Sequence, residues 1–357
     1  MTDPTTTGSS EVESLREDAS AWDRFVETSG ASPYTQVSAW AEVKRANGWS
    51  AERIITDGGS GAIGGQVLLR RVRPTPFGVG YVPRGPVAQT LDEASLAAFT
   101  EELRALTSRS RLSHVTIDPE VADPGAARVL RSLGWVPGRD VQPRETRIID
   151  IDASEQELWG GLRSKWRQYV QKARRAGIVV ADSGAPGLED FYRIMVETGE
   201  RTGFAHRSLA SYRRSLEAYM ARGAARLLLA RLSDGTPVAT LILISCGGRV
   251  VEHAGGMTAA GAAMRASYLI KWEAIRSSSA AGFAHYDMWG LARWRPGIEQ
   301  FKAGFGGREV RYIGAWDLVG SATARAALMA AYRLRFSMAQ RRMSRDSANG
   351  GEGDRAP

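Results

Sequence analysis

Near its C-terminal end the chain reads Phe301-Lys302-Ala303-Gly304-Phe305-Gly306-Gly307, with His285-Tyr286-Asp287-Met288-Trp289-Gly290 before it and Gly314-Ala315-Trp316-Asp317-Leu318 after it. The middle stretch sets one lysine among three glycines and two phenylalanines. Glycine lets a ligand approach the backbone because it has no Cβ. A cation enclosed there acts at reduced dielectric, where it stabilises an oxyanion or a phosphate strongly. Lys302 is therefore a candidate active-site cation, and a solvated lysine at a strand-turn-strand corner is the alternative.

Outward from this stretch, a helical pattern that ends at glycine and leads into an apolar strand recurs along the chain. Glycine just past a helix is the usual left-handed stop. Helices that alternate with strands in this way indicate a mixed α/β (α+β) fold. The unit occurs at Ala41–Trp49, Ala126–Trp135, Tyr169–Ile178 and Tyr268–Phe283.

Other segments fit the same class. The capping-box spacing of Thr90 and Glu93 predicts a helix to about Ser108, and Asp123-Pro124 predicts the start of the next helix. The remaining apolar runs predict strands at His114–Ile117, Arg226–Ala230, Val238–Ser245 and Arg249–Ala254.

The length of 357 residues suits two domains. We place their boundary near Ile151-Asp152, after a predicted strand at Thr146–Ile151. This gives a first domain of residues 20–150 and a second of residues 151–319. The polar ends, residues 1–19 and 346–357, predict a disordered arm and a disordered tail.

Three features favour a cytoplasmic protein. No apolar run is long enough to span a membrane. The N-terminus is polar and acidic, unlike a secretory signal, and the single cysteine, Cys246, cannot form an internal disulfide.

The chain is basic, with a net charge of +8 and a pI of about 9.8, which favours an anionic partner. The predicted helix at residues 163–175 concentrates this charge, since it holds six cations and no acid. Such a ridge binds RNA phosphates without reading sequence, and a solvated helix face is the alternative. The six residues are Arg163, Lys165, Arg167, Lys172, Arg174 and Arg175.

Several common kinds of catalytic site are not indicated. None of the four histidines stands three or four residues from another histidine or cysteine, so no metal site is predicted. Cys246 follows an apolar strand, which is typical of a buried structural thiol. The turn at Arg174–Ile178 only half matches the coenzyme A phosphate turn, which argues against acetyl-CoA as donor. We therefore expect no cofactor.

The C-terminal motifs Tyr-Asp-x-x-Gly, Phe-Lys-x-Gly-Phe-Gly-Gly and Gly-x-Trp-Asp-Leu resemble those of the Fem family, which comprises aminoacyl-tRNA-dependent transferases that build the peptidoglycan cross-bridge. Similar stretches occur at Gln36–Lys44, Tyr81–Pro86 and Lys165–Gly177. The resemblance implies two tandem acetyltransferase-like (GNAT-like) domains with a cleft between them. It also implies a last helix, within residues 320–345, that packs on the first domain. No long helical hairpin fits, which indicates the compact type.

The resemblance also implies roles for single residues. Lys44 and Arg207 would clamp the pyrophosphate of a nucleotide-linked precursor. Lys302 would stabilise the oxyanion and the Phe301 carbonyl would orient the attacking amine. Asp118 or a substrate hydroxyl would take the proton. By themselves, Lys44 is typical of a surface lysine and Asp118 of a turn aspartate. The other substrate-binding residues implied are Trp40, Arg84, Tyr212, Tyr268 and Gly306.

The function implied is transfer of glycine, alanine or serine from aminoacyl-tRNA to the side-chain amine of a muramyl pentapeptide, linked to uridine diphosphate or to lipid. We expect a monomer whose basic C-terminal helix packs on the first domain or touches the inner membrane face. The family's tyrosines after Val250 are not matched by Val251–Met257, so acceptor recognition is expected to differ. The alternatives are a tailoring enzyme for a small antibiotic precursor, a non-catalytic RNA-binding or membrane-binding protein, and a conventional acetyltransferase.

Overall fold

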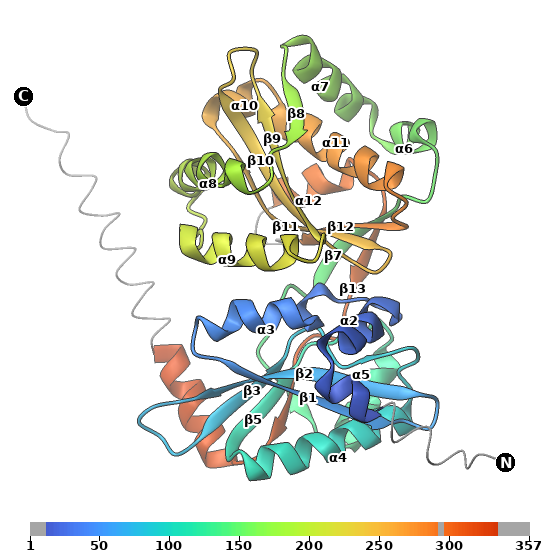
Figure 1. Ribbon diagram of the computed structural model, residues 1–357, viewed down its shortest axis with the longest axis vertical. Coiled ribbons are helices and arrows are strands. Elements are labelled where there is room, and N and C mark those ends of the chain that lie inside the picture. Colours follow the sequence, from blue (N-terminus) through green and yellow to red (C-terminus); the bar gives the residue numbers. More distant parts are fainter. Residues whose placement is uncertain (1–11, 292–295, 335–357) are drawn as a thin grey trace, which may run out of the picture.

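The computed structural model describes residues 12–291 and 296–334, which form two lobes, each a mixed sheet with helices on both faces (Figure 1). The first lobe has the strand order β1-β2-β3-β5-β14-β6, with β4 paired to β2. Its strands are β1 (Ser50–Asp57), β2 (Ala62–Arg71), β3 (Gly78–Val82), β4 (Val87–Ala88), β5 (Leu112–Ile117), β6 (Val136–Pro137) and β14 (Trp316–Val319).

The second lobe has the order β13-β7-β12-β11-β10-β9-β8. Its strands are β7 (Glu145–Asp150), β8 (Val179–Asp182), β9 (Ala225–Arg231), β10 (Pro237–Cys246), β11 (Arg249–Met257), β12 (His285–Gly290) and β13 (Arg308–Arg311). The predicted hairpin of β9 and β10 and the strand after it are therefore confirmed.

The two sheets share one arrangement. The order β9-β10-β11-β12-β7-β13 repeats the order β1-β2-β3-β5-β14-β6, with one parallel pair in each, β11 with β12 and β3 with β5. In each sheet the fifth strand lies apart in the chain from most strands of its own sheet. The fifth strand of the second sheet, β7, precedes the other strands of that sheet in the chain. The fifth strand of the first sheet, β14, follows the whole second lobe. The expected boundaries are therefore wrong for these two strands: β7 lies in the second sheet and β14 in the first. Each strand finds its partners far along the chain, which a local pattern does not specify.

The helices of the first lobe cover both faces of its sheet. Phe99, Leu103 and Leu106 bring α4 onto one face, as predicted, although its N-cap is Asp92 and not Thr90. The expected arm is wrong for residues 12–19, because residues 12–17 are helical and Leu15 is buried in the core. The helices are α2 (Ala19–Thr28), η1 (Tyr34–Gln36), α3 (Ser38–Arg45), α4 (Glu93–Arg109) and α5 (Pro124–Ser132).

In the second lobe, α7 and α11 pack together on one face of the sheet, and α8 and α9 lie on the other (Figure 1). Lys302 lies in the last turn of a helix, not at a strand-turn-strand corner. The helices are α6 (Glu155–Gly161), α7 (Ser164–Arg175), η2 (Ala185–Gly187), α8 (Leu188–Thr202), α9 (Leu209–Met220), α10 (Ala259–Ala263), α11 (Ala266–Ala280) and α12 (Pro296–Ala303).

One hydrophobic core joins the lobes. Trp22 and Trp40 of the first lobe share a buried cluster with Phe191 and Tyr219 of the second, and the Tyr219 hydroxyl donates to the Tyr34 carbonyl across the junction (2.6 Å). The lobes therefore pack as one body through α3 and α9.

The last described helix, residues 322–334, lies against the first lobe (Figure 1). Arg325 at its start donates to Asp317 of β14 (2.7 and 2.9 Å). The rest of the expected helix, residues 335–345, and the tail at 346–357 lie outside the described residues. Within the described part of the chain, no helix has both the length and the apolar character needed to cross a membrane.

Candidate active site

The second sheet opens between β11 and β12. The two strands pair only from Arg249 to Val251, although β11 continues to Met257. A cavity of about 420 Å³ lies where they diverge, walled by α8, β11, α11, β12 and α12, and we call it the splay cavity. In the described residues, the inner edge of β11 has no strand partner beyond Val251, which leaves backbone groups for a ligand.

Lys302 lines the splay cavity. Its ammonium donates to the carbonyls of Met288 (2.7 Å), Trp289 (3.1 Å) and Gly290 (2.7 Å), at the end of β12. Burial lowers the pKa of Lys302 to about 8, Lys271 adds to that effect, and Glu252 opposes it. The ammonium is thus enclosed, as its proposed role requires, but all three of its hydrogens already have acceptors. The cavity is lined by the second lobe alone and not by both.

Phe301 also lines the splay cavity, but its carbonyl accepts a hydrogen bond from Trp166 Nε1 (2.9 Å). Its ring contacts Tyr268 and Phe305, with centroids 5.0 and 5.3 Å away. Tyr268 therefore supports Phe301 from behind and does not line the cavity. Gly306 lies in the turn after α12 with φ of +89°, and its carbonyl accepts a hydrogen bond from Arg147. Gly306 likewise does not line the cavity.

The predicted clamp residues lie on the two sides of the junction between the lobes, but of the two cations only Arg207 lines a cavity there, and Lys44 does not. The Lys44 ammonium of α3 sits 4.4 Å from the centre of the Trp40 ring. Burial, together with the charge of Arg207, lowers the pKa of Lys44 to about 8. Arg207 and Tyr212 line a second cavity of about 490 Å³, the clamp cavity, and the Arg207 amide donates to the Tyr212 hydroxyl (3.3 Å).

His253 lies near both cations, because it lines the clamp cavity with Arg207 and its ring centre is 6.5 Å from that of Trp40, against which Lys44 packs. Burial lowers its pKa to about 3, and Arg207 and Lys44 reinforce the shift. Its ring nitrogens lie 3.3 Å from the hydroxyls of Tyr34 and Ser215. Two cations held close together repel each other, so an anion bound between them is favoured. Because His253, Trp289 and Gly290 line both cavities, the clamp cavity adjoins the splay cavity.

Asp118 is enclosed at the end of β5. It accepts hydrogen bonds from the Tyr81 hydroxyl (2.7 Å) and from the amides of Arg84 (2.6 Å) and Gln142 (3.3 Å). Burial raises its pKa to about 6, against the opposing charge of Arg84. Asp118 lines neither the splay cavity nor the clamp cavity. The structure therefore does not bring it to Lys302, and Tyr81 is its route to a cavity on the first sheet.

Arg84 links the lobes. Its guanidinium lies 5.0 Å from the ring centres of both Trp289 and Tyr312, and it donates to the Pro143 carbonyl (2.7 Å). It also approaches Glu120 (3.4 Å). Its position between second-lobe rings makes it a structural bridge beside the clamp cavity and not part of its wall.

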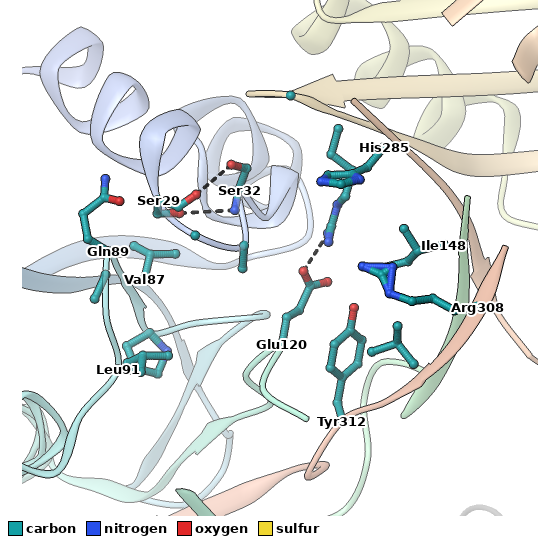
Figure 2. A pocket seen from close by; sticks show the side chains of 17 residues that line it. Ser29, Ser32, Val87, Gln89, Leu91, Glu120, Ile148, His285, Arg308 and Tyr312 are labelled. Atoms are coloured by element: carbon teal, nitrogen blue, oxygen red, sulfur yellow. Dashed lines mark hydrogen bonds and ion pairs between the residues drawn. The ribbon is translucent and has the colours of Figure 1, made fainter. Parts of the chain in front are cut away.

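A buried ionic network continues from Glu120 into the second lobe. Arg249 donates to Glu120 (2.6 Å) and approaches Asp287 (3.9 Å). Burial alone would lower the pKa of Arg249, but Glu120 and Asp287 outweigh it and raise that pKa. Figure 2 shows Glu120 with Tyr312, Arg308 and His285 around a cavity of about 340 Å³ between the lobes. Sequence reasoning missed this network, because the pair that joins the lobes, Glu120 and Arg249, is 129 residues apart in the chain.

We expect Arg249→Met to lower the free energy of unfolding by about 3–5 kcal/mol, because it removes a buried positive charge that Glu120 and Asp287 share. Urea unfolding measures this change. Arg308→Met, an exposed arginine on the same cavity, is the matched control and should cost less than about 1 kcal/mol. Equal losses for the two variants would contradict a structural role for the network.

Only some of the basic side chains of helix α7 are available to a ligand, because others are bonded within the protein. Arg167 donates to the carbonyls of Gly160 and Leu162, and Arg174 pairs with Glu273 (2.8 Å). The side chains that stay exposed without such partners in the described structure are Arg163, Lys165, Lys172 and Arg175. Lys165 and Arg265 both face the Tyr169 ring, at 5.8 and 4.6 Å, so an aromatic ring lies within the ridge.

Cys246 is buried, and burial raises the pKa of its thiol to about 12. A thiol that stays protonated is a poor nucleophile. Among the described residues, no group of three or more His, Cys, Asp or Glu side chains could hold a metal ion.

Comparison with known proteins agrees with this geometry. The FemAB family profile matches residues 18–123, and an acetyltransferase (GNAT) domain profile matches residues 160–303. The crystal structure of FemX superposes with a TM-score of 0.80 at 20% identity, covering 87% of this chain and 98% of that one. The expectation of two tandem acetyltransferase-like domains is confirmed.

The sequence is also similar to curated enzymes. It is 32% identical over 223 residues to the lipid II:glycine glycyltransferase of Staphylococcus haemolyticus (strain JCSC1435), covering 59% of this chain and 53% of that protein. It is 31% identical over 230 residues to the enzyme of the same name from Staphylococcus aureus (strain MRSA252), covering 61% and 54%. The chain thus spans about half the length of these relatives.

Proposed function

We propose that this chain is a member of the Fem family, which its similarity to the FemAB profile and to two glycyltransferases supports. We propose further that it transfers glycine from glycyl-tRNA to an amine of a peptidoglycan precursor whose muramyl peptide is carried on a pyrophosphate. The single observation that carries the proposal is that Arg207 of the second lobe and the Trp40–Lys44 pair of the first lobe both lie by His253, whose ring also borders the cavity that holds Lys302. Glycine is chosen because the curated relatives are glycyltransferases. Alanine and serine are the other donors to test.

In this proposal the clamp cavity binds the pyrophosphate of the acceptor. Lys44 and Arg207 each supply a positive charge, one from each lobe. Charge-assisted hydrogen bonds to phosphate are stronger than hydrogen bonds between neutral groups. A pyrophosphate occurs both in a uridine diphosphate carrier and in a lipid carrier, so the clamp suits either. A precursor held there lies next to the splay cavity, because the two cavities share part of their walls.

The aminoacyl ester of the donor would enter the splay cavity. The ester is already activated, so the amine nitrogen attacks its carbonyl directly, an amide forms, and the ribose oxygen leaves with a proton. The protein needs to position two substrates and stabilise one oxyanion. Lys302 contributes its charge, and the carbonyls it holds keep the end of β12 in place. Asp118 lies outside both cavities, so a hydroxyl of the substrates is the candidate proton acceptor.

The exposed cations of α7 would hold the acceptor arm of the tRNA, an A-form helix recognised through its backbone. The aromatic residues around Phe301 connect α7 to the splay cavity, since Trp166 of α7 donates to the Phe301 carbonyl. The helix α7 therefore packs directly against the wall of the splay cavity. A tRNA bound along α7 could then place its terminal ester in that cavity.

We expect the triple variant Lys165→Gln, Lys172→Gln, Arg175→Gln to bind tRNA at least about tenfold more weakly and to reduce the slope of log K against log salt by about 2. Filter binding over a salt series measures both quantities. Three exposed arginines of α4 and α5, Arg104, Arg109 and Arg128, changed together to glutamine make a control of equal charge. An unchanged slope in the α7 variant would remove this helix from the tRNA interface.

The proposed function is tested by incubating the protein with radiolabelled glycyl-, alanyl- and seryl-tRNA and either lipid II or uridine-diphosphate muramyl pentapeptide. The expected product is acid-stable label in the peptide. If no charged tRNA supports transfer to either acceptor, the proposal fails. Transfer from acetyl-CoA would identify a conventional acetyltransferase, and transfer only to a small amine without a pyrophosphate would identify a tailoring enzyme.

A further inference from the structure

Glu252 is the carboxylate in the wall of the splay cavity. It stands on β11 one residue beyond Val251, the last residue that pairs with β12. The residue is only 7% exposed. Its Oε1 accepts a hydrogen bond from the Tyr286 hydroxyl (2.9 Å), and its Oε2 pairs with the Lys271 ammonium. A buried carboxylate with two such partners is fixed in position, yet each oxygen keeps a free lone pair.

Charges of both signs surround this carboxylate. Glu252 and Asp287 act on Lys302 as opposite charges, and Lys271 acts on it as a like charge. Arg249 approaches Asp287 (3.9 Å), and Arg201 also lines the cavity, where it donates to the Met257 carbonyl. The Lys271 ammonium is occupied on one side by Glu252 and lies 5.6 Å from the centre of the Phe301 ring. Lys302 has given its three hydrogens to backbone carbonyls. Glu252 is thus the group best able to accept a further hydrogen bond from a cation.

The proposed donor carries such a cation. An aminoacyl ester has a free α-amine one carbon from the reacting carbonyl, and an α-amino group with a pKa near 7.7–8.0 is largely protonated at neutral pH. Taking an ammonium out of water into this mostly apolar cavity is unfavourable unless an acceptor meets it. Two hydroxyls in the wall already have acceptors: Thr198 donates to the carbonyl of Ile194 or Met257, and Thr240 donates to the Leu228 carbonyl.

We propose that Glu252 binds the α-ammonium of the aminoacyl group, with Lys271 and Tyr286 holding its carboxylate in place. This inference rests on the proposed function and adds to it a reason for donor choice. An ammonium held at Glu252 places the adjoining ester carbonyl between β11 and the end of β12, where Lys302 lies. Donors whose amine is acylated, such as formylaminoacyl-tRNA or peptidyl-tRNA, cannot make this contact and are rejected.

The first test compares donors and needs no variant. Glycyl-tRNA and glycolyl-tRNA carry the same tRNA and differ only in an amine or a hydroxyl, and N-acetylglycyl-tRNA carries a blocked amine. In single-turnover assays with one acceptor, we expect wild-type protein to use glycyl-tRNA at least about tenfold faster than either analogue, since a hydrogen bond to a charged group is lost. Equal rates with glycyl- and glycolyl-tRNA overturn the inference.

The second test uses Glu252→Gln, which keeps shape and removes the charge. We expect transfer from glycyl-tRNA to fall about tenfold to a hundredfold while transfer from glycolyl-tRNA changes little, so that the ratio of the two approaches one. Glu217→Gln makes the same change at an exposed glutamate of α9 outside the cavity and is the matched control; its ratio should stay within about threefold of wild type. If Glu252→Gln slows both donors equally, Glu252 has a structural role only and the inference fails. If wild-type protein transfers nothing from any charged tRNA, the proposed function itself fails.

Discussion

Lys302→Met is expected to reduce aminoacyl transfer by at least about a hundredfold, the scale of loss when an oxyanion-stabilising group is removed from an enclosed site. Methionine is of similar length and fills the space, but it carries no charge. It also leaves the carbonyls of Met288 and Gly290 facing the cavity without the donor that now holds them. Single-turnover transfer from glycyl-tRNA measures the effect. Transfer within about tenfold of wild type would exclude the proposed role.

The pH profile separates this role from a structural one. Lys302 has a pKa of about 8 against an ordinary 10.5, so its charge is lost as pH rises through 8. At saturating acceptor the wild-type rate should therefore fall above about pH 8, and Lys302→Met should lack the fall.

Loss of fold does not mimic that alkaline fall. The folded-state pKa of Lys302 lies below its unfolded value, so the unfolded chain binds the proton more tightly between pH 8 and pH 10.5. The contribution of Lys302 to the free energy of unfolding therefore increases with pH across this window. Thermal unfolding of both proteins over the same pH range is the control.

Arg207→Met and Lys44→Met are each expected to raise KM for the pyrophosphate-linked acceptor about tenfold to a hundredfold, because each removes a charge-assisted contact to phosphate. Arg207→Met should also raise the pKa of Lys44, since the charge of Arg207 helps to lower it. In wild-type protein the acceptor affinity should weaken above about pH 8, where Lys44 loses its proton. Steady-state assays with varied acceptor measure these effects.

Two controls test the clamp, one a variant of the protein and the other a change in the acceptor. Arg45→Met removes an exposed neighbouring cation of α3 and should leave KM within about twofold. A pentapeptide acceptor without the pyrophosphate should react equally with wild type and both clamp variants. If the clamp variants lower kcat and leave KM unchanged, the two cations act on the reaction and not on the carrier, which would contradict the clamp.

Local signals predicted much of the fold. The Asp123-Pro124 start of α5, the β9–β10 hairpin and the apolar face of α4 appeared where sequence placed them, because caps, turns and periodicity act over a few residues. The arm was wrong because Leu15 packs into the core. The domain boundaries were wrong for β7 and β14 because a strand's partners are chosen over long distances.

The candidate site divides in the same way. Sequence motifs nominated Lys302, Lys44 and Arg207 as residue types in recognisable contexts. Only the tertiary structure decided what each one touches. In the folded protein the Lys302 ammonium donates to three carbonyls, and the Phe301 carbonyl accepts a hydrogen bond from Trp166. Asp118 lies outside the splay cavity.

By itself, then, the sequence determined the class of fold, the resemblance to the Fem family and the cations that a reaction on anionic substrates needs. The tertiary structure decided that β11 and β12 part after Val251 and that Glu252 meets Lys271 and Tyr286 there. The physical reason is one of range. Propensity, capping and turns depend on neighbours in the chain, whereas a buried charge is defined by partners that only the folded packing brings within hydrogen-bonding distance.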